Sequence, residues 1–230
     1  MAGQLALDVG LSDTATFAAF EPGRNAEVMA VLAAMAAGDG EPQAFIFGKP
    51  DSGRSHLTQA ACHAACGTAI WVPLHEMGHL GPEIIENLET SALVCLDDLD
   101  AVLPDAAWEE ALFNFINAAR ERGTRFVVAA RNPPAELGIA LPDLVSRLSW
   151  GPVFQVRSLD DAGRRAALIR RARARGFDLP QEAADYILRH ASRDLSALMG
   201  LLERIDRASL TAQRRVSLPF VRELLSHDLL

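Results

Sequence analysis

The stretch "QAFIFGKPDSGRS" (residues 43–55) decides the fold of this chain. It begins with a short apolar run and passes through a glycine-rich turn into helix-forming sequence, "SHLTQAACHAAC" (55–66). Gly48 and Gly53 stand five positions apart, and a basic residue and a hydroxyl follow, which is the spacing of a phosphate-binding loop. Such a loop needs glycines because backbone N–H groups at a helix N-terminus must approach the phosphate closely. The stretch therefore predicts a strand, a phosphate-binding loop and a helix in immediate succession.

The basic position of the loop holds Arg54, where phosphate-binding loops usually carry lysine. The only lysine of the chain, Lys49, stands five positions too early for that role. Arginine keeps the positive charge but presents a planar fork, so its hold on phosphates differs from that of an ammonium group. Read alone, the stretch could also be a plain strand–turn–helix junction. The loop residues that we expect to contact nucleotide are Gly48, Lys49, Asp51, Ser52, Gly53, Arg54, Ser55 and His56.

A second motif, "ALVCLDDLD" (92–100), places Asp97 and Asp98 at the end of another apolar run. In a fold with a phosphate-binding loop, the first of these acids is placed to hold Mg²⁺ through its water shell, together with the Ser55 hydroxyl. Enzymes that hydrolyse ATP in this way generally carry glutamate at the second position. Asp98 is one methylene shorter, so we expect it to be a weakened second acid, with little or no self-hydrolysis.

The order of apolar runs and helical patterns predicts an α/β fold followed by an all-helical part. Fully apolar runs that alternate with helices indicate a parallel sheet flanked by helices on both faces. The expected strands are 43–48, 69–73, 92–100, 125–132 and 152–157, and the expected helices between them are 25–37, 55–66, 82–89 and 108–123. Beyond Leu159 only helical patterns follow. We therefore expect a flexible leader (1–15), an α/β nucleotide-binding subdomain (16–158) and a small helical lid subdomain (159–230).

The composition narrows the possible partners. The formal net charge is −8, which disfavours DNA binding by the chain itself because phosphate neutralisation needs a basic face. No apolar run is long enough to span a membrane and no secretory signal is present, so we expect a cytoplasmic protein without a membrane partner. The three cysteines show no disulfide pattern, and buried thiols explain them best.

One segment of the expected lid, "GRRAALIRRARARGF" (163–177), is rich in arginine. A solvated face with alternating charge would explain it. An electrostatic contact with an acidic partner, or with DNA, would explain it too, and both alternatives stay open. The arginines concerned are Arg164, Arg165, Arg170, Arg171, Arg173 and Arg175.

The order of these motifs resembles that of AAA+ ATPases, and most closely the DnaA-like family. Within that family the chain is similar to the short Hda type, the regulatory inactivators of DnaA, which also carry arginine in the loop. The resemblance covers nearly the whole chain and implies the AAA+ P-loop fold with a C-terminal helical lid. Its carriers are "TFAAFEPGRNAEV" (16–28), "GKPDSGRSHLTQAA" (48–61), "LVCLDDLD" (93–100), "LPDLVSRLSWG" (141–151), "LRHASRDLSALMGLLERIDRAS" (188–209) and "LPFVREL" (218–224).

The resemblance also implies roles for single residues. Arg147, in "LVSRLSWG", matches the arginine finger that reaches into a neighbouring subunit's nucleotide. Arg193, in "SRDLS", matches the sensor-2 arginine, which contacts the phosphates from the lid. Arg131 stands at the sensor-1 position, where a small polar or acidic residue is usual, and this departure also argues against self-hydrolysis. The residues that would line the adenine pocket are Phe20, Gly23 and Asn25, and the implied cofactors are ADP (or ATP) and Mg²⁺.

The leader contains "QLALD" (4–8), which resembles the pentapeptide with which bacterial proteins dock on the replication sliding clamp. Gln4 would hydrogen-bond in a polar subsite, and Leu5 and Leu7 would fill an apolar pocket. The aromatic residue that often ends such motifs is absent.

The function that the resemblance implies is that of an adaptor. It would dock on the DNA-loaded clamp, stimulate hydrolysis of DnaA-bound ATP and so negatively regulate initiation of replication. The chain stops at Leu230 without a helix-turn-helix domain, so no sequence-specific DNA binding is expected, and a homo-oligomer such as a homodimer is. Two alternatives remain: an autonomous AAA+ ATPase of helicase-loader type, and a nucleotide-independent scaffold that tethers a partner to the clamp.

Overall fold

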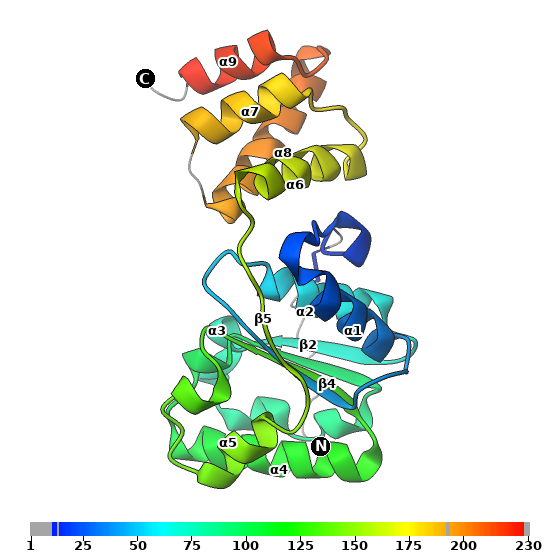
Figure 1. Cartoon of the computed structure of the whole chain (residues 1–230), viewed down its shortest axis with the longest axis vertical. Helices are drawn as coiled ribbons and strands as arrows, with labels where there is room; N and C mark the ends of the chain where they lie inside the picture. The colour runs from blue at the N-terminus through cyan, green and yellow to red at the C-terminus, as the bar shows by residue number, and fades with distance from the viewer. Residues whose placement is uncertain (1–10, 13, 192–193, 228–230) are drawn as a thin grey trace.

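The computed structural model describes residues 11, 12, 14–191 and 194–227. The described chain forms two stacked parts, an α/β part and a bundle of helices that lies beyond one end of it (Figure 1). The proposed clamp-binding residues Gln4, Leu5 and Leu7 lie outside the described residues, and so does Arg193.

A single parallel sheet forms the centre of the α/β part, with strand order β2-β3-β4-β1-β5. β3 is buried along its whole length, as expected for a parallel strand that is covered on both faces. Because all strands run in the same direction, their carboxyl ends meet at one edge of the sheet. The strands are β1 (Gln43–Phe47), β2 (Ala69–Pro73), β3 (Leu93–Asp97), β4 (Arg125–Ala130) and β5 (Val153–Gln155).

Two layers of helices cover this sheet (Figure 1). On one face lie α1 (Ala26–Ala36) and α2 (Arg54–Ala64), which bury Leu32 and Leu57 completely. On the other face lie α4 (Ala106–Arg122), α5 (Pro142–Leu148) and the short α3 (Leu74–Met77), around a core that includes Phe126. The prediction of a parallel α/β fold is confirmed.

The remaining helices form a lid with a core of its own. It contains α6 (Asp161–Ala174), α7 (Gln181–His190), α8 (Leu195–Ala212) and α9 (Leu218–His227). Its buried side chains, from Leu168 to Val221, come from these helices and the turns between them.

Two expected helices differ in the structure, and two helices, α3 and α5, were not expected. Residues 82–89 do not form an α-helix. They form the 3-10 turns Pro82–Ile85 and Leu88–Thr90, separated by Asn87 in the left-handed region (φ 62). α4 begins two residues early because the Asp105 side chain accepts hydrogen bonds from the N–H groups of Ala107 and Trp108.

The arginines of α6 mostly bind partners within the chain. Arg170 pairs with Glu21 at 3.1 Å, and Arg171 donates to the backbone and side chain of Thr14, so both fasten the lid to the segment before α1. Arg164, Arg165 and Arg175 pair with acids of the lid itself. Of the six arginines, all of them described, only Arg173 has neither an ion pair nor a side-chain hydrogen bond. Most arginines of this segment therefore form ion pairs or hydrogen bonds within the chain.

A buried carboxylate fixes the start of α5. Glu109, only 4% exposed, accepts hydrogen bonds from the backbone N–H groups of Ala140 and Leu141 at 2.9–3.1 Å. These groups lie immediately before Pro142, where α5 begins. Because Glu109 belongs to α4, this side chain sets how α5 sits on its neighbour.

Replacing Glu109 by alanine should lower the free energy of unfolding by about 1–3 kcal/mol, because it leaves two backbone donors without their acceptor. Urea unfolding followed by circular dichroism measures this change. The adjacent Glu110→Ala, at an exposed position of the same helix, is the matched control and should be near neutral. Equal effects of the two substitutions would contradict this role of Glu109.

Candidate nucleotide-binding site

The predicted phosphate loop connects the carboxyl end of β1 to the first turn of α2. A side chain at Gly48 would meet the Val156 carbonyl oxygen at 2.4 Å, and one at Gly53 would meet the Phe20 ring at 2.8 Å. Gly53 also has a φ of 98 and caps α2, a conformation that favours glycine. Both glycines are therefore required by the close approach of the backbone. The buried Ser52 Oγ has no hydrogen-bond partner, which leaves it free to donate to a ligand in the loop.

Arg54 turns toward the acids at the end of β3. Its Nη2 lies 3.1 Å from Asp98 Oδ1, and its Nη1 lies 4.0 Å from Asp100 Oδ1. The guanidinium is buried, and Nη1 has no hydrogen-bond partner. Asp100 is also held by Arg131, whose Nε lies 2.9 Å away. The carboxyl edge of the sheet thus carries a small ionic network.

Asp97 and Ser55 lie at the same edge of the sheet. The Asp97 carboxylate is 1% exposed, and the Ser55 hydroxyl is near enough to favour its charged form. Burial, followed by repulsion from Asp98, raises the pKa of Asp97 to about 6, although Ser55 and Arg54 act in the opposite direction. A hydroxyl and a carboxylate beside a phosphate loop are suitable ligands for Mg²⁺, directly or through water. Among the described residues there is no group of three or more His, Cys, Asp or Glu that could hold a metal by themselves.

A cavity beside the loop has the composition of a base-binding pocket. Phe20 and His56 meet there with ring centroids 5.4 Å apart, next to Ser52 and Gly53. The His56 ring bonds to the Thr16 carbonyl oxygen at 2.8 Å, and burial lowers the pKa of His56, so the neutral ring is favoured. Four residues of the lid helices close the other side: Ala167, Arg171, Leu195 and Met199.

Other predicted loop and pocket residues lie differently. Asn25 is buried, but its side-chain amide is fully engaged with the backbone of Arg157, at 2.9 and 2.8 Å. It therefore fixes the connection from β5 to the lid. Gly23 lines a separate cavity against that connection. Lys49 is exposed on the loop, and Asp51 lines a small cavity between the loop and the lid.

Two residues that line the cavities between the phosphate loop and the lid were not predicted as site residues. Arg164 lines the same cavity as Pro50 and Asp51, and Leu159 lines all three cavities around the loop. Arg164 was seen only as a member of an arginine-rich segment, because nothing in the local sequence shows which turn of a helix faces a neighbouring loop. Leu159 carries no chemical signal at all.

Arg147 lies at the opposite end of the sheet from the loop. Its backbone carbonyl accepts a hydrogen bond from Gln43 Nε2 at 2.7 Å, and Gln43 is the first residue of β1, whereas the loop follows the last. The Arg147 guanidinium lies over the Phe113 ring at 4.0 Å and within 5.1 Å of the Trp150 ring, a half-exposed side chain. Five residues of strand separate the two ends by roughly 15 Å, so this side chain and the loop do not form one site.

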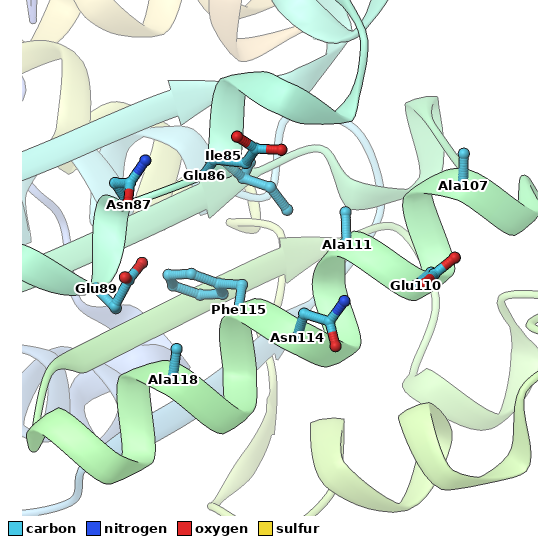
Figure 2. A pocket seen from close by; sticks show the side chains of 10 residues that line it. All are labelled: Ile85, Glu86, Asn87, Glu89, Ala107, Glu110, Ala111, Asn114, Phe115 and Ala118. Carbon is cyan, nitrogen blue, oxygen red and sulfur yellow. The ribbon is translucent and has the colours of Figure 1, made fainter.

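A hollow of ≈ 480 Å³ lies elsewhere, between α4 and the turns of residues 82–90 (Figure 2). Three carboxylates border it, from Glu86, Glu89 and Glu110. Their negative charge opposes phosphate, so this hollow is not the nucleotide site.

The described helices include none that is both long and apolar enough to cross a membrane.

Comparison with known proteins defines the class. The chain superposes on domain III of the replication initiator DnaA from Thermotoga maritima with a TM-score of 0.76, at 20% identity, over 95% of this chain and 98% of that one. It also matches AMPPCP-bound DnaA from Aquifex aeolicus (TM-score 0.65, 21% identity, 85% of this chain and 66% of that one). The RuvB Holliday junction branch migration motor of Thermotoga maritima matches less well (TM-score 0.60, 18% identity, 90% and 68%). The fold is that of AAA+ proteins.

The sequence of the lid identifies a more specific family than the fold does. Residues 161–225 match the family model of the Hda lid domain. The lid thus matches the Hda family and the chain has the fold of DnaA domain III, in agreement with the resemblance that its motifs carry.

The raised pKa of Asp97 predicts a pH-dependent stability. Because the folded pKa (about 6) lies above the ordinary value of 3.8, the folded state holds the proton more tightly, and this contribution is lost as pH rises from about 4 to about 6. The loss amounts to roughly 3 kcal/mol. Asp97→Asn should flatten this part of the profile, measured by urea unfolding at several pH values. The exposed Asp143→Asn should leave the slope unchanged; a slope that persists in Asp97→Asn would refute the assignment.

Proposed function

We propose that this protein is an adaptor that binds an adenine nucleotide, ADP in the first place, and activates ATP hydrolysis on a neighbouring DnaA. One observation carries the proposal: Arg147 lies at the far end of β1 from the chain's own phosphate loop. An arginine placed there can serve only a nucleotide that another subunit holds. An arginine finger stabilises charge on the transferring phosphoryl group and contributes about 10³–10⁵ in rate.

Nucleotide binding to this chain is supported by its own residues. The glycine-required loop, the unpartnered Ser52 hydroxyl and the Phe20–His56 pocket lie together between the core and the lid. Two of the DnaA structures with this fold contain AMPPCP. Ser55 and Asp97 are the residues that would hold Mg²⁺, which supplies charge neutralisation at the phosphates when it is bound. From the lid, Arg193 is proposed to reach the phosphates as the sensor-2 arginine.

The surroundings of Arg147 fit a side chain that is held ready for a partner. Contacts with Phe113 and Trp150 restrict the guanidinium, so less side-chain entropy is lost when it docks. Among the described residues, no carboxylate forms an ion pair with it. Its charge is therefore available to a phosphate.

The remaining parts of the proposal are docking on the DNA-loaded sliding clamp through Gln4, Leu5 and Leu7, and self-association. The pentapeptide alone supports the clamp contact. Hydrolysis of DnaA-bound ATP would then act as negative regulation of initiation in the cytoplasm, without sequence-specific DNA binding by this chain.

Arg147→Ala should abolish stimulation of DnaA's ATP hydrolysis, lowering the stimulated rate by at least about 10²-fold, because it removes the guanidinium proposed to stabilise the transferring phosphoryl group. The measurement is phosphate release by DnaA with DNA-loaded clamp, with and without this protein. Arg122→Ala, at an exposed position of α4, is the control and should stimulate as the unaltered protein does. ADP affinity should be unchanged in both variants. Normal stimulation by Arg147→Ala would refute the finger assignment.

Gln4→Ala should weaken clamp binding, because it removes the hydrogen-bonding side chain of the pentapeptide, and should lower stimulation only when the clamp is present. Surface plasmon resonance on immobilised clamp measures the affinity. A matched substitution outside the pentapeptide, Gln213→Ala, should bind normally. If Gln4→Ala binds the clamp as tightly as the unaltered chain, the proposed docking motif is wrong.

A further inference from the structure

The buried guanidinium of Arg54 has a consequence for the chemistry of this chain's own site, and the inference rests on the nucleotide site proposed above. The Arg54 side chain is 7% exposed and spans two carboxylates, with Nη2 at 3.1 Å from Asp98 Oδ1 and Nη1 at 4.0 Å from Asp100 Oδ1. A buried charge of this kind stays with its partners, because leaving one of them unpaired costs several kcal/mol.

The backbone at Asp98 has a defined conformation. Asp98 adopts the left-handed region (φ 54), which aspartate tolerates, and its N–H donates to Asp97 Oδ1 at 3.0 Å. The carboxylate itself is held by Arg54.

Hydrolysis of ATP would need that carboxylate for another task. The oxygen of a water molecule bonds to the γ-phosphorus, the bond from this phosphorus to the bridging oxygen of ADP breaks, and the proton of the water passes to a base. A carboxylate at position 98, beside the loop, is the group that this edge of the sheet offers for orienting the water. Its Oδ1 instead accepts a hydrogen bond from Nη2 of Arg54.

Arg54 can hold a phosphate at the same time. A guanidinium has five N–H donors in a fixed plane, and the buried Nη1 of Arg54 has no hydrogen-bond partner. The unpartnered Ser52 hydroxyl lies two residues away in the same loop. The site therefore has unused donors for phosphate while Nη2 stays on Asp98.

We propose that Arg54 is a positioning residue that keeps the carboxylate at position 98 away from the attacking water, so that the site holds nucleotide without hydrolysing it. A lysine at this position has a single point charge and no fork, so it could not span Asp98 and Asp100 while it contacts phosphate. The arginine in the loop is then the reason for slow turnover, together with the short side chain at position 98.

Four proteins test this: the unaltered chain, Arg54→Lys, Asp98→Glu and the double variant. Turnover of ATP is measured without DnaA or clamp, so the result does not depend on the finger or the docking motif. We expect the double variant to hydrolyse ATP at least about tenfold faster than Asp98→Glu alone, because only the double variant has both a released and a sufficiently long carboxylate. A tenfold gain in Arg54→Lys alone would support the same mechanism. The exposed lid substitution Arg189→Lys is the matched control and should not change turnover.

Equal turnover in Asp98→Glu and the double variant would overturn the proposal, because the length of the carboxylate would then be the whole barrier. A second measurement covers the case in which no variant turns over ATP. Asp98→Ala removes the acceptor that holds Nη2 of Arg54, so it should tighten ADP binding by about fivefold in the Arg54 background and by less than about twofold in the Arg54→Lys background, measured by calorimetry. Equal gains in the two backgrounds would show only the loss of a negative charge and would overturn the proposal. Failure of DnaA stimulation in the earlier experiment would leave both results unaffected.

Discussion

Negative charge buried at the carboxyl edge of the parallel sheet must be compensated, and the site depends on how this chain does so. Asp97, Asp98 and Asp100 follow one another at the end of β3, where a parallel sheet collects its functional groups. Removing carboxylates from water is expensive unless charges or hydrogen bonds replace the lost hydration. Arg54 comes from the phosphate loop after β1 and Arg131 from the end of β4, the strand that lies between β1 and β3, so both cations come from the same edge of the sheet as the acids. The loop is therefore bound to the acids even without a ligand.

The architecture could be read from the sequence because its signals are local. Apolar runs of four to six residues, the glycine spacing of the loop and the change to purely helical patterns after Leu159 each follow from short-range chemistry. The placement of Ser55 and Asp97 at one edge of the sheet is also local in origin, because the loop after β1 and the end of β3 both lie at the carboxyl ends of parallel strands. The model of the Hda lid domain covers the residues in which the sequence also predicted a helical lid.

Other features of the fold and the site could not be predicted from the sequence, because they depend on packing between distant segments. The turns of residues 82–90 carry a helical pattern, but Asn87 adopts a positive φ where the segment lies against α4. Asn25 was assigned to the adenine pocket, whereas its amide bonds to the backbone of Arg157, 132 positions away. The direction of Arg54, toward acids rather than into the loop, is likewise set by residues far along the chain.

The two ends of β1 separate two kinds of chemistry. At its carboxyl end the loop, the pocket and the lid surround a nucleotide site in which arginine is already paired with acid. At its amino end Gln43 fixes the helix that carries Arg147, and this arginine has aromatic neighbours but no carboxylate in the described chain. Arg54 forms ion pairs with acids of its own subunit. The charge of Arg147 is not neutralised by a carboxylate of the described chain and is available to a ligand of another subunit. In the proposed function Arg54 would hold the chain's own nucleotide while Arg147 acts on that of a neighbour, and the contacts of Arg170 and Arg171 with the segment before α1 hold the lid against the core that carries both residues.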